Sequence, residues 1–220
     1  MYKGVWCPKD ENLSPKILIL GESHYGDAGT QGQLSSGLTK DVIEYFLAGK
    51  VKDNWKEFFY KIAMSFGYKR DIDEVAEFYN RVYFGNYVDV LCDTGAGNRA
   101  KEFIWQNRIK YNNDLFDFCN VNEIDILICF SKAVYNAMPK FELVGEKEWE
   151  IEIGKLGKKE RRNLANKTVY KKGIRDECKV GLKKDLIVYG IRHPSSAGGY
   201  NTNQAYEYLT KELKGCFICR

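Results

Sequence analysis

The stretch Lys16-Ile-Leu-Ile-Leu-Gly-Glu-Ser-His-Tyr-Gly-Asp27 decides the fold predicted for this chain. Its aliphatic run, 17–20, stops at a glycine and is followed at once by polar, reactive side chains. An uninterrupted aliphatic run of this length is typical of a strand that is buried on both faces, and therefore of a parallel sheet covered by helices. In such sheets, ligands bind beyond the carboxyl ends of the strands. We therefore expect binding-site residues at Gly21, Glu22, Ser23, His24 and Tyr25.

A second segment near the end of the chain has the same design. The apolar run Asp185-Leu-Ile-Val-Tyr-Gly-Ile191 leads into Arg192-His-Pro-Ser-Ser196. The sequence contains two histidines, His24 and His193, and each follows one of these two predicted strands. Because the carboxyl ends of parallel strands meet at one edge of a sheet, we expect both histidines at one shared slot.

The rest of the chain alternates predicted strands with predicted helices. Two further strands are expected at 81–91 and 125–130, where β-branched, aromatic and aliphatic residues cluster. The spacing of apolar residues predicts helices at 39–48, 53–66, 71–80, 99–120 (broken near 112–113), after Ser131, and at 203–214. The apolar stripe of the helix at 53–66 is assigned to core packing. This order implies a single α/β domain over 1–220, a three-layer α/β/α sandwich with a four-stranded parallel sheet.

Residues 141–181 do not continue this alternation of predicted strands and helices. Trp149, Ile151 and Ile153 alternate with glutamates and a basic run follows, so we predict a basic, β-rich insertion shaped like a hairpin with a cationic tip. The segment 155–184 holds twelve Lys and Arg and three acidic residues, whereas the whole chain carries a net charge of only +4. Such asymmetry indicates either a polyanionic partner or a solvated surface, and the sequence does not distinguish the two.

Composition is that of an ordinary globular protein. Hydrophobic residues make up 44% and charged residues 29%. No apolar run approaches the ~20 residues that span a bilayer, and the first residues do not resemble a signal peptide, so we expect a cytoplasmic protein with no membrane partner. Several of the seven cysteines lie in apolar runs, which indicates reduced, buried thiols. Cys216 and Cys219 have metal-ligand spacing but no second pair, so no metal and no cofactor are expected.

The side chains at the strand ends suggest a chemistry. A carboxylate such as Glu22 can orient water or stabilise a cationic transition state, and a neutral imidazole can donate a hydrogen bond to a developing anion. Asn86 is unusual within a predicted strand and needs a partner if it is buried. The hydroxyls and backbone N–H groups of Ser195 and Ser196 suit a phosphate.

These motifs resemble those of the uracil-DNA glycosylase superfamily, whose fold is a four-stranded parallel sheet between helices. The first motif of that family is G-Q-D-P-Y-H in the main branch and G-E-x-P-G in the iron–sulfur branch, and Gly21-Glu-Ser-His-Tyr-Gly26 aligns with both without gaps. The second motif, H-P-S after the last strand, is matched by His193-Pro-Ser195. Asn86 is similar in placement to the asparagine with which the family reads a base.

The resemblance implies a role for each of these residues. A base is flipped into the pocket, because its glycosidic bond cannot be reached inside a base stack. Asn86 reads the Watson–Crick edge of the base, and His193 hydrogen-bonds the leaving base as it becomes an anion. Glu22 holds the attacking water and faces the cationic sugar, and Tyr25 closes the pocket. The flanking phosphates are gripped by Ser195 and Ser196.

The chain also departs from the family pattern. Ser23 stands where the main branch has a water-positioning aspartate, His24 replaces the motif proline, and the cysteines of the iron–sulfur branch are not matched, so no cluster is expected. Three hypotheses stay open. The first is a glycosylase that acts on DNA or a modified nucleotide, and the second is a non-catalytic protein that binds nucleic acid or a nucleotide in the same pocket. The third is a metal-dependent hydrolase that uses Glu22, His24 and His193. The sequence indicates nothing about the oligomeric state.

Overall fold

The structure is a computed structural model of the 220-residue chain. It describes the whole chain except residues 1–3, 11, 27–29, 31, 36, 51–52, 94–98, 140–143, 156–157, 175–176, 196–198, 217 and 219–220. Within helices and strands, the side chains of 53–55, 93, 99, 144–155 and 158–163 are not placed.

The central sheet has the strand order β3-β1-β5-β8-β7-β6. Its first four strands are parallel, and they are β3 (Tyr83–Asn86), β1 (Ile17–Gly21), β5 (Ile126–Cys129) and β8 (Leu186–Ile191). The last two, β7 (Lys158–Tyr170) and β6 (Val144–Lys155), are antiparallel to their neighbours. The α/β prediction is confirmed, but the expectation of a four-stranded sheet is wrong. The basic insertion is not separate from the sheet, because its strand β7 pairs with the outer edge of β8. The pairing runs from Ala165 opposite Ile191 to Tyr170 opposite Leu186.

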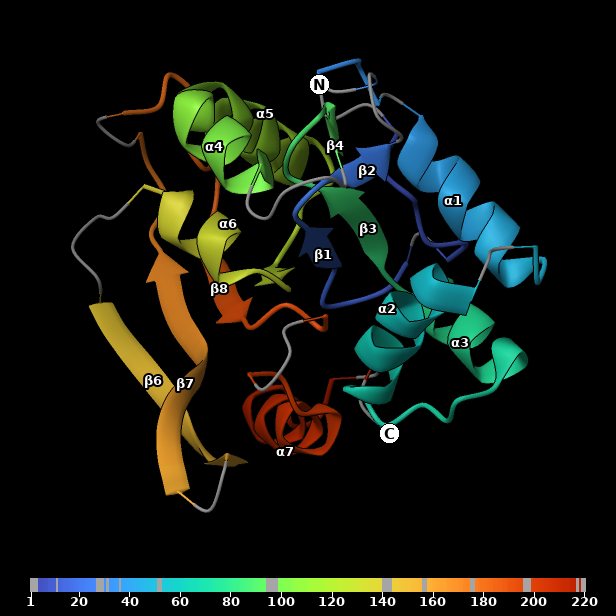
Figure 1. The fold of residues 1–220 in the computed structure, drawn as a ribbon. Helices are drawn as coiled ribbons and strands as arrows, with labels where there is room; N and C mark the ends of the chain where they lie inside the picture. Colours follow the sequence, from blue (N-terminus) through green and yellow to red (C-terminus); the bar gives the residue numbers. More distant parts are fainter. Residues whose placement is uncertain are drawn as a thin grey trace.

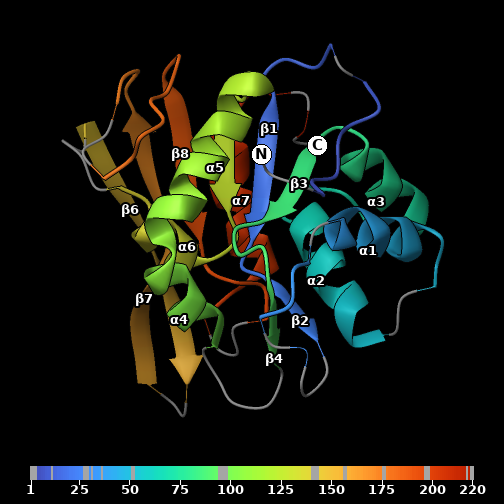
Figure 2. The ribbon, with the colours of Figure 1, turned by 90° about the horizontal axis from the view of Figure 1, so that it is seen from above.

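Helices cover both faces of the sheet (Figure 1, Figure 2). One face packs against α1 (Leu38–Leu47), α2 (Asp53–Met64), α3 (Ile72–Tyr79) and α7 (Thr202–Glu212). The other face packs against α4 (Arg99–Gln106), α5 (Arg108–Val121) and α6 (Lys132–Ala137). Successive residues of β1 alternate between the two cores, with Ile17 and Ile19 in one and Leu18 and Leu20 in the other. This alternation explains why the run contains no polar residue, as expected for a strand buried on both faces.

The strand predicted at 81–91 is divided in the structure. Strand β3 ends at Asn86, and the backbone N–H groups of Tyr87 and Val88 then donate to the carbonyls of Gly21 and Glu22, at 3.1 and 2.9 Å. These hydrogen bonds hold residues 87–88 beside Gly21 and Glu22, at the end of β1. A short strand β4 (Leu91–Asp93) follows, and it pairs in parallel with β2 (His24–Gly26) in a separate two-stranded sheet. The residues directly after β1 are therefore held by hydrogen bonds at the carboxyl edge of the main sheet.

The long helix predicted at 99–120 is broken, but at Asn107 rather than at Asn112 and Asn113. Asn112 lies fully buried within α5. Its amide accepts a hydrogen bond from the Tyr87 hydroxyl at 2.8 Å and donates one to the carbonyl of Ala137 at 3.0 Å. A buried amide that is paired in this way is compatible with a helix interior, which is why a polar residue did not mark the break.

Candidate functional site

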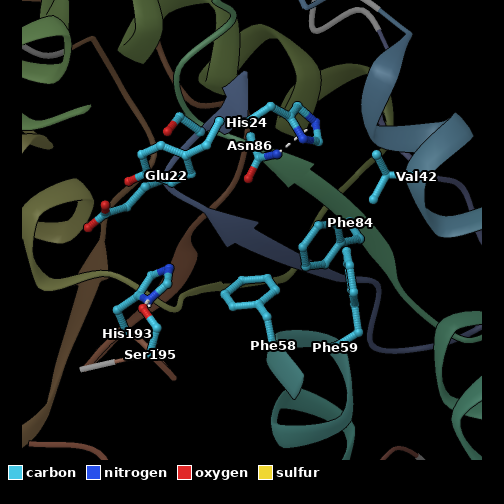
Figure 3. Close-up of a pocket in the computed structure, with 11 residues that line it drawn as sticks. Glu22, His24, Val42, Phe58, Phe59, Phe84, Asn86, His193 and Ser195 are labelled. Carbon is cyan, nitrogen blue, oxygen red and sulfur yellow. Dashed lines mark hydrogen bonds between the residues drawn. The ribbon is translucent and has the colours of Figure 1, made fainter. Parts of the chain in front are cut away.

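A cavity of about 210 Å³ opens at the carboxyl edge of the sheet, where β1, β3 and β8 end (Figure 3). Glu22 and His193 both line it, although they come from strand ends far apart in the sequence. The structure therefore brings together the two segments that the sequence analysis expected at one slot. The lining residues are Glu22, Ser23, His24, Tyr25, Val42, Phe58, Phe59, Phe84, Asn86, His193 and Ser195.

One half of the cavity is apolar and aromatic. Phe58 and Phe59 on α2 and Phe84 on β3 form this half together with Val42 of α1 (Figure 3). The ring of Phe58 stacks on that of His193, with 5.1 Å between centroids and 28° between planes. The sequence analysis assigned the apolar stripe of α2 to core packing. Phe59 is buried in the core, but Phe58 and Phe59 also line the cavity, which the sequence analysis did not predict. Helical periodicity identifies an apolar stripe, but it does not show which end of the stripe faces a cavity.

The hydrogen bonds of His193 determine where its proton lies. The backbone N–H of Ser195 donates to Nδ1 at 3.2 Å, and the Ser195 hydroxyl lies 2.7 Å from the same atom. Because a backbone N–H can only donate, Nδ1 must accept, and a neutral ring then carries its proton on Nε2. In Figure 3 this second nitrogen is turned away from Ser195, toward the side of the cavity that holds Glu22. His193 therefore presents an N–H donor to the cavity.

The surroundings of His193 favour the neutral ring. Burial lowers the pKa of His193 below its ordinary value, the negative charge of Glu22 acts in the opposite direction, and the positive charge of Lys61 lowers the pKa further. Lys61 also fixes the loop that carries the histidine, since its Nζ donates to the carbonyl of Pro194 at 3.1 Å. The hydroxyl of Tyr200 donates in turn to the carbonyl of Lys61 at 3.2 Å. Helix α2 thus holds the His-Pro-Ser turn and favours an uncharged imidazole.

The carboxylate of Glu22 is held by Ser131. The Ser131 hydroxyl donates to Glu22 Oε1 at 2.5 Å, and it accepts from the backbone N–H of Val134 at 3.2 Å as the N-cap of α6. Ser131 is fully buried and Glu22 is half-buried, so the hydrogen bond is partly sheltered from solvent. The sequence analysis predicted a helix directly after Ser131 but missed the contact of Ser131 with the carboxylate. A fixed carboxylate beside a neutral imidazole donor is suited to a reaction in which positive and negative charge develop on the two sides of one bond.

Asn86 is paired with His24. Asn86 Nδ2 donates to His24 Nε2 at 2.9 Å, and the Thr39 hydroxyl lies 2.7 Å from the same ring nitrogen. Because an amide nitrogen only donates, Nε2 accepts and His24 is neutral, and burial lowers the pKa of His24 to about 4. The amide oxygen of Asn86 lies over Gly21, so close that a Cβ on Gly21 would be 2.4 Å from it. His24, Thr39 and Gly21 therefore fix which way the Asn86 amide points.

The other predicted site residues differ in exposure, and one lies outside the described part of the chain. Tyr25 is 41% exposed, and burial of its hydroxyl, aided by the charge of Glu22, raises the pKa of Tyr25 to about 12. The hydroxyl oxygen of Ser23 is shielded from solvent. Ser195 is exposed and contacts His193, as described above, and its role in gripping a phosphate stays a prediction. Ser196 lies outside the residues that the structure describes.

The positive charge of the segment 155–184 is partly offset by acidic residues elsewhere in the chain. Lys167 pairs with Glu212 at 2.7 Å. At the other end of the segment, Lys171 pairs with Asp185 at 2.7 Å and Lys184 with Asp125 at 2.5 Å. Because these ion pairs neutralise part of the segment, the charge asymmetry of the sequence overstates the positive charge of this surface.

The structure describes no metal-binding group. Within its described residues, no three or more His, Cys, Asp or Glu side chains are arranged to hold a metal ion. The described cysteines are free thiols, and Cys92, Cys119, Cys129 and Cys178 are buried, which raises their pKa. The second member of the predicted Cys216–Cys219 pair lies outside the described residues.

A scan against protein-family models found no matching family, and a search of curated proteins found no matching relative. The described helices include none that is long and apolar enough to cross a membrane. The function is therefore inferred from the geometry of the cavity and from the motif resemblance.

Proposed function

We propose that the cavity binds a planar heterocyclic base flipped out of DNA, and that Glu22 and His193 cleave the N-glycosidic bond of that base. The arrangement of His193 carries this proposal, because a neutral imidazole presents its Nε2–H donor to a cavity that also contains a fixed carboxylate. The proposal agrees with the activity that the resemblance to uracil-DNA glycosylases implies.

The size and walls of the cavity suit one base. A volume of about 210 Å³ corresponds to that of roughly seven liquid water molecules, which is below the ~300–1,000 Å³ of pockets for larger ligands. Three phenylalanine rings supply apolar walls (Phe58, Phe59 and Phe84). Stacking of a base on an aromatic ring contributes about 1–3 kcal/mol and depends little on which base is bound. The aromatic half therefore supplies affinity, and the polar half must supply selectivity.

Asn86 supplies the selectivity in this proposal. One of its two amide hydrogens is engaged by His24, so the carbonyl oxygen and the other hydrogen are left for a ligand. An acceptor beside a donor complements the N–H and C=O groups of a lactam edge, as in uracil, hypoxanthine or xanthine. A site that pairs such an edge rejects a base whose donor and acceptor are exchanged, because buried polar groups would remain unpaired.

Bond cleavage follows from the same geometry. The C1′–N bond breaks and its electron pair moves to the base, where Nε2–H of His193 donates a hydrogen bond to the developing anion. The sugar becomes an oxocarbenium-like cation, which the negative charge of Glu22 stabilises. A water molecule then attacks C1′, and Glu22 accepts the proton that this water loses. The products are the free base and an abasic sugar.

A second candidate function is base binding without cleavage. It is favoured by the hydrogen bond that Ser131 donates to Glu22, because an engaged carboxylate is a weaker base for activating water. The position of Ser23 also supports it, since the resemblance places a second carboxylate there and serine supplies no charge.

An abasic-site assay tests the proposal. Single- and double-stranded oligonucleotides that contain uracil, hypoxanthine or xanthine are incubated with the protein and treated with alkali to cut at abasic sites. We expect strand cleavage with at least one base, and a loss of about 10²-fold or more in Glu22→Gln and His193→Ala. Glu44→Gln, which changes an exposed carboxylate on α1, is the control and should cleave normally. Binding without any cleavage would favour the second candidate, and cleavage that survives both substitutions would overturn the mechanism.

A further inference from the structure

The β6–β7 hairpin is much longer than the strand to which it is attached. Strands β6 and β7 have 12 and 13 residues, whereas β8 has six. Pairing between β7 and β8 begins at Ala165, so residues 158–164 of β7 have β6 as their paired strand. At about 3.4 Å per residue, this two-stranded extension reaches roughly 20 Å beyond the sheet.

The extension projects from the edge of the sheet that carries the cavity. Ala165 is paired with Ile191, the last residue of β8, and His193 follows two residues later. In Figure 2 the end of the hairpin where β6 finishes and β7 begins lies toward the same end of the molecule as β2 and β4. Strand β7 lies three strand positions from β1 in the sheet, which corresponds to roughly 14 Å at the usual strand spacing.

The described tip of the hairpin, residues 155 and 158–162, is strongly basic. It contains Lys155, Lys158, Lys159, Arg161 and Arg162, with Glu160 as its one acidic residue. The register places Arg161 opposite Glu152, but it places Lys158 opposite Lys155, Lys159 opposite Gly154 and Arg162 opposite Ile151. Three cationic positions of β7 therefore have a residue other than a carboxylate directly across the ribbon.

The register places one pair of like charges, Lys155 and Lys158, at the end of the ribbon. Like charges directly opposite each other destabilise a pair of strands, and a two-stranded ribbon outside a larger sheet is marginally stable in water. A bound polyanion would relieve the repulsion between the lysines. Nucleic-acid backbones are polyanions, and two-stranded ribbons are known to fit the grooves of duplexes.

We propose that this tip, which we call the basic arm, binds the phosphate backbone of the nucleic acid whose base occupies the cavity. The inference rests on the proposed function, because the cavity defines which nucleic acid is bound. At 3.4 Å per base pair, the lateral separation of roughly 14 Å puts the arm over phosphates about four base pairs from the flipped nucleotide. The arm thus makes a polynucleotide, rather than a free nucleoside, the preferred ligand.

Salt dependence of binding tests the arm. The arm variant is Lys158→Gln/Lys159→Gln/Arg162→Gln. The matched control is Lys172→Gln/Lys179→Gln/Lys183→Gln, which removes the same charge from exposed lysines between the end of β7 and the start of β8, at the opposite edge of the sheet. Affinity for a uracil-containing duplex is measured at several salt concentrations. The slope of log K against log salt should fall by about 2–3 in the arm variant, since each phosphate contact contributes ~0.9, and it should not change in the control.

The outcomes separate the arm from the proposed function. If the arm variant keeps the parental slope while the protein still releases a base, the arm proposal is overturned and the function stands. If the slope falls but no base is ever released, the arm stands and the cleavage mechanism fails. Equal losses in the arm variant and in the control would show a general charge effect and overturn the arm proposal. Thermal unfolding shows whether the variants fold, and the single variant Arg162→Gln, with an expected change of ~0.9, replaces the triple variant if that one does not.

Discussion

Substitution of Gly21 by alanine tests whether the cavity is organised around the Asn86 amide. Gly21 ends β1, and its φ is not in the left-handed region, so alanine introduces no backbone strain. The added Cβ would lie 2.4 Å from Asn86 Oδ1 and 3.5 Å from Phe58 Cζ. The second distance is an ordinary contact and the first is not. The whole effect of the substitution therefore acts through one amide.

The size of the effect follows from these distances. An ordinary carbon–oxygen contact requires the amide to move by about 1 Å, which stretches its 2.9 Å hydrogen bond to His24 beyond hydrogen-bonding range. The lost hydrogen bond costs about 0.5–1.5 kcal/mol and the overpacking about 1–3 kcal/mol. Alanine in a strand recovers about 0.5–1 kcal/mol relative to glycine. We expect Gly21→Ala to lower the free energy of unfolding by about 1–3 kcal/mol, and to weaken base binding by about 5- to 150-fold as the bidentate contact is lost.

A double-mutant cycle with Asn86→Ala isolates this contact. Chemical denaturation of the parent, the two single variants and the double variant gives the coupling energy. With the amide removed, the Cβ introduced at position 21 meets only ordinary contacts, so Gly21→Ala should stabilise the Asn86→Ala background by about 0.5–1 kcal/mol. A coupling energy of about 1.5–4 kcal/mol is therefore expected. Equal costs in both backgrounds would show that the Asn86 amide does not lie over Gly21, and the reading of the base edge would fail with it.

Three further predictions concern the same residues. The pKa of His24 falls from 6.5 to about 4 on folding, so between these pH values the folded protein binds fewer protons than the unfolded chain. The free energy of unfolding should therefore decrease by about 3 kcal/mol as pH falls from 6.5 to 4. Denaturation at several pH values should show a smaller decrease in His24→Gln, whose amide oxygen can still accept a hydrogen bond from Asn86. Because burial lowers the pKa of His193, base release should stay constant as pH rises from 7 to 8, and a fall there would mean that the charged imidazole acts. Ser131→Ala removes a hydrogen bond that both positions the Glu22 carboxylate and weakens it as a base. Under the proposed mechanism the loss of position outweighs the gain in basicity, so base release should slow more than base binding weakens, and equal losses in rate and affinity would argue against this positioning role.

Much of the fold could be predicted because its signals are local. Residues 17–20 and 186–191 read as buried strands from four or more consecutive apolar side chains, and both are strands buried in the sheet. The alternation around Trp149 predicted a hairpin, and β6 and β7 form one. The number of strands in the sheet could not be read in this way. Whether β7 pairs with β8 depends on which backbone edge remains free once the parallel strands have assembled, and that is a property of the whole sheet.

In the candidate site, too, local sequence signals predicted some features, whereas features that depend on long-range contacts were not predicted. Polar residues directly after two buried strands indicated where Glu22 and His193 would meet, because the geometry of parallel sheets brings strand ends together. The contact between His24 and Asn86 joins residues 62 positions apart, and that of Thr39 with His24 spans a loop and the start of a helix. No spacing rule predicts either contact. Yet these contacts decide the protonation state of His24 and the direction of the Asn86 amide. Under the proposed function, that direction determines which edge of a base the cavity accepts. Under the proposed function, specificity therefore depends on a histidine that the sequence analysis placed at the slot, but whose hydrogen bond with Asn86 it did not predict.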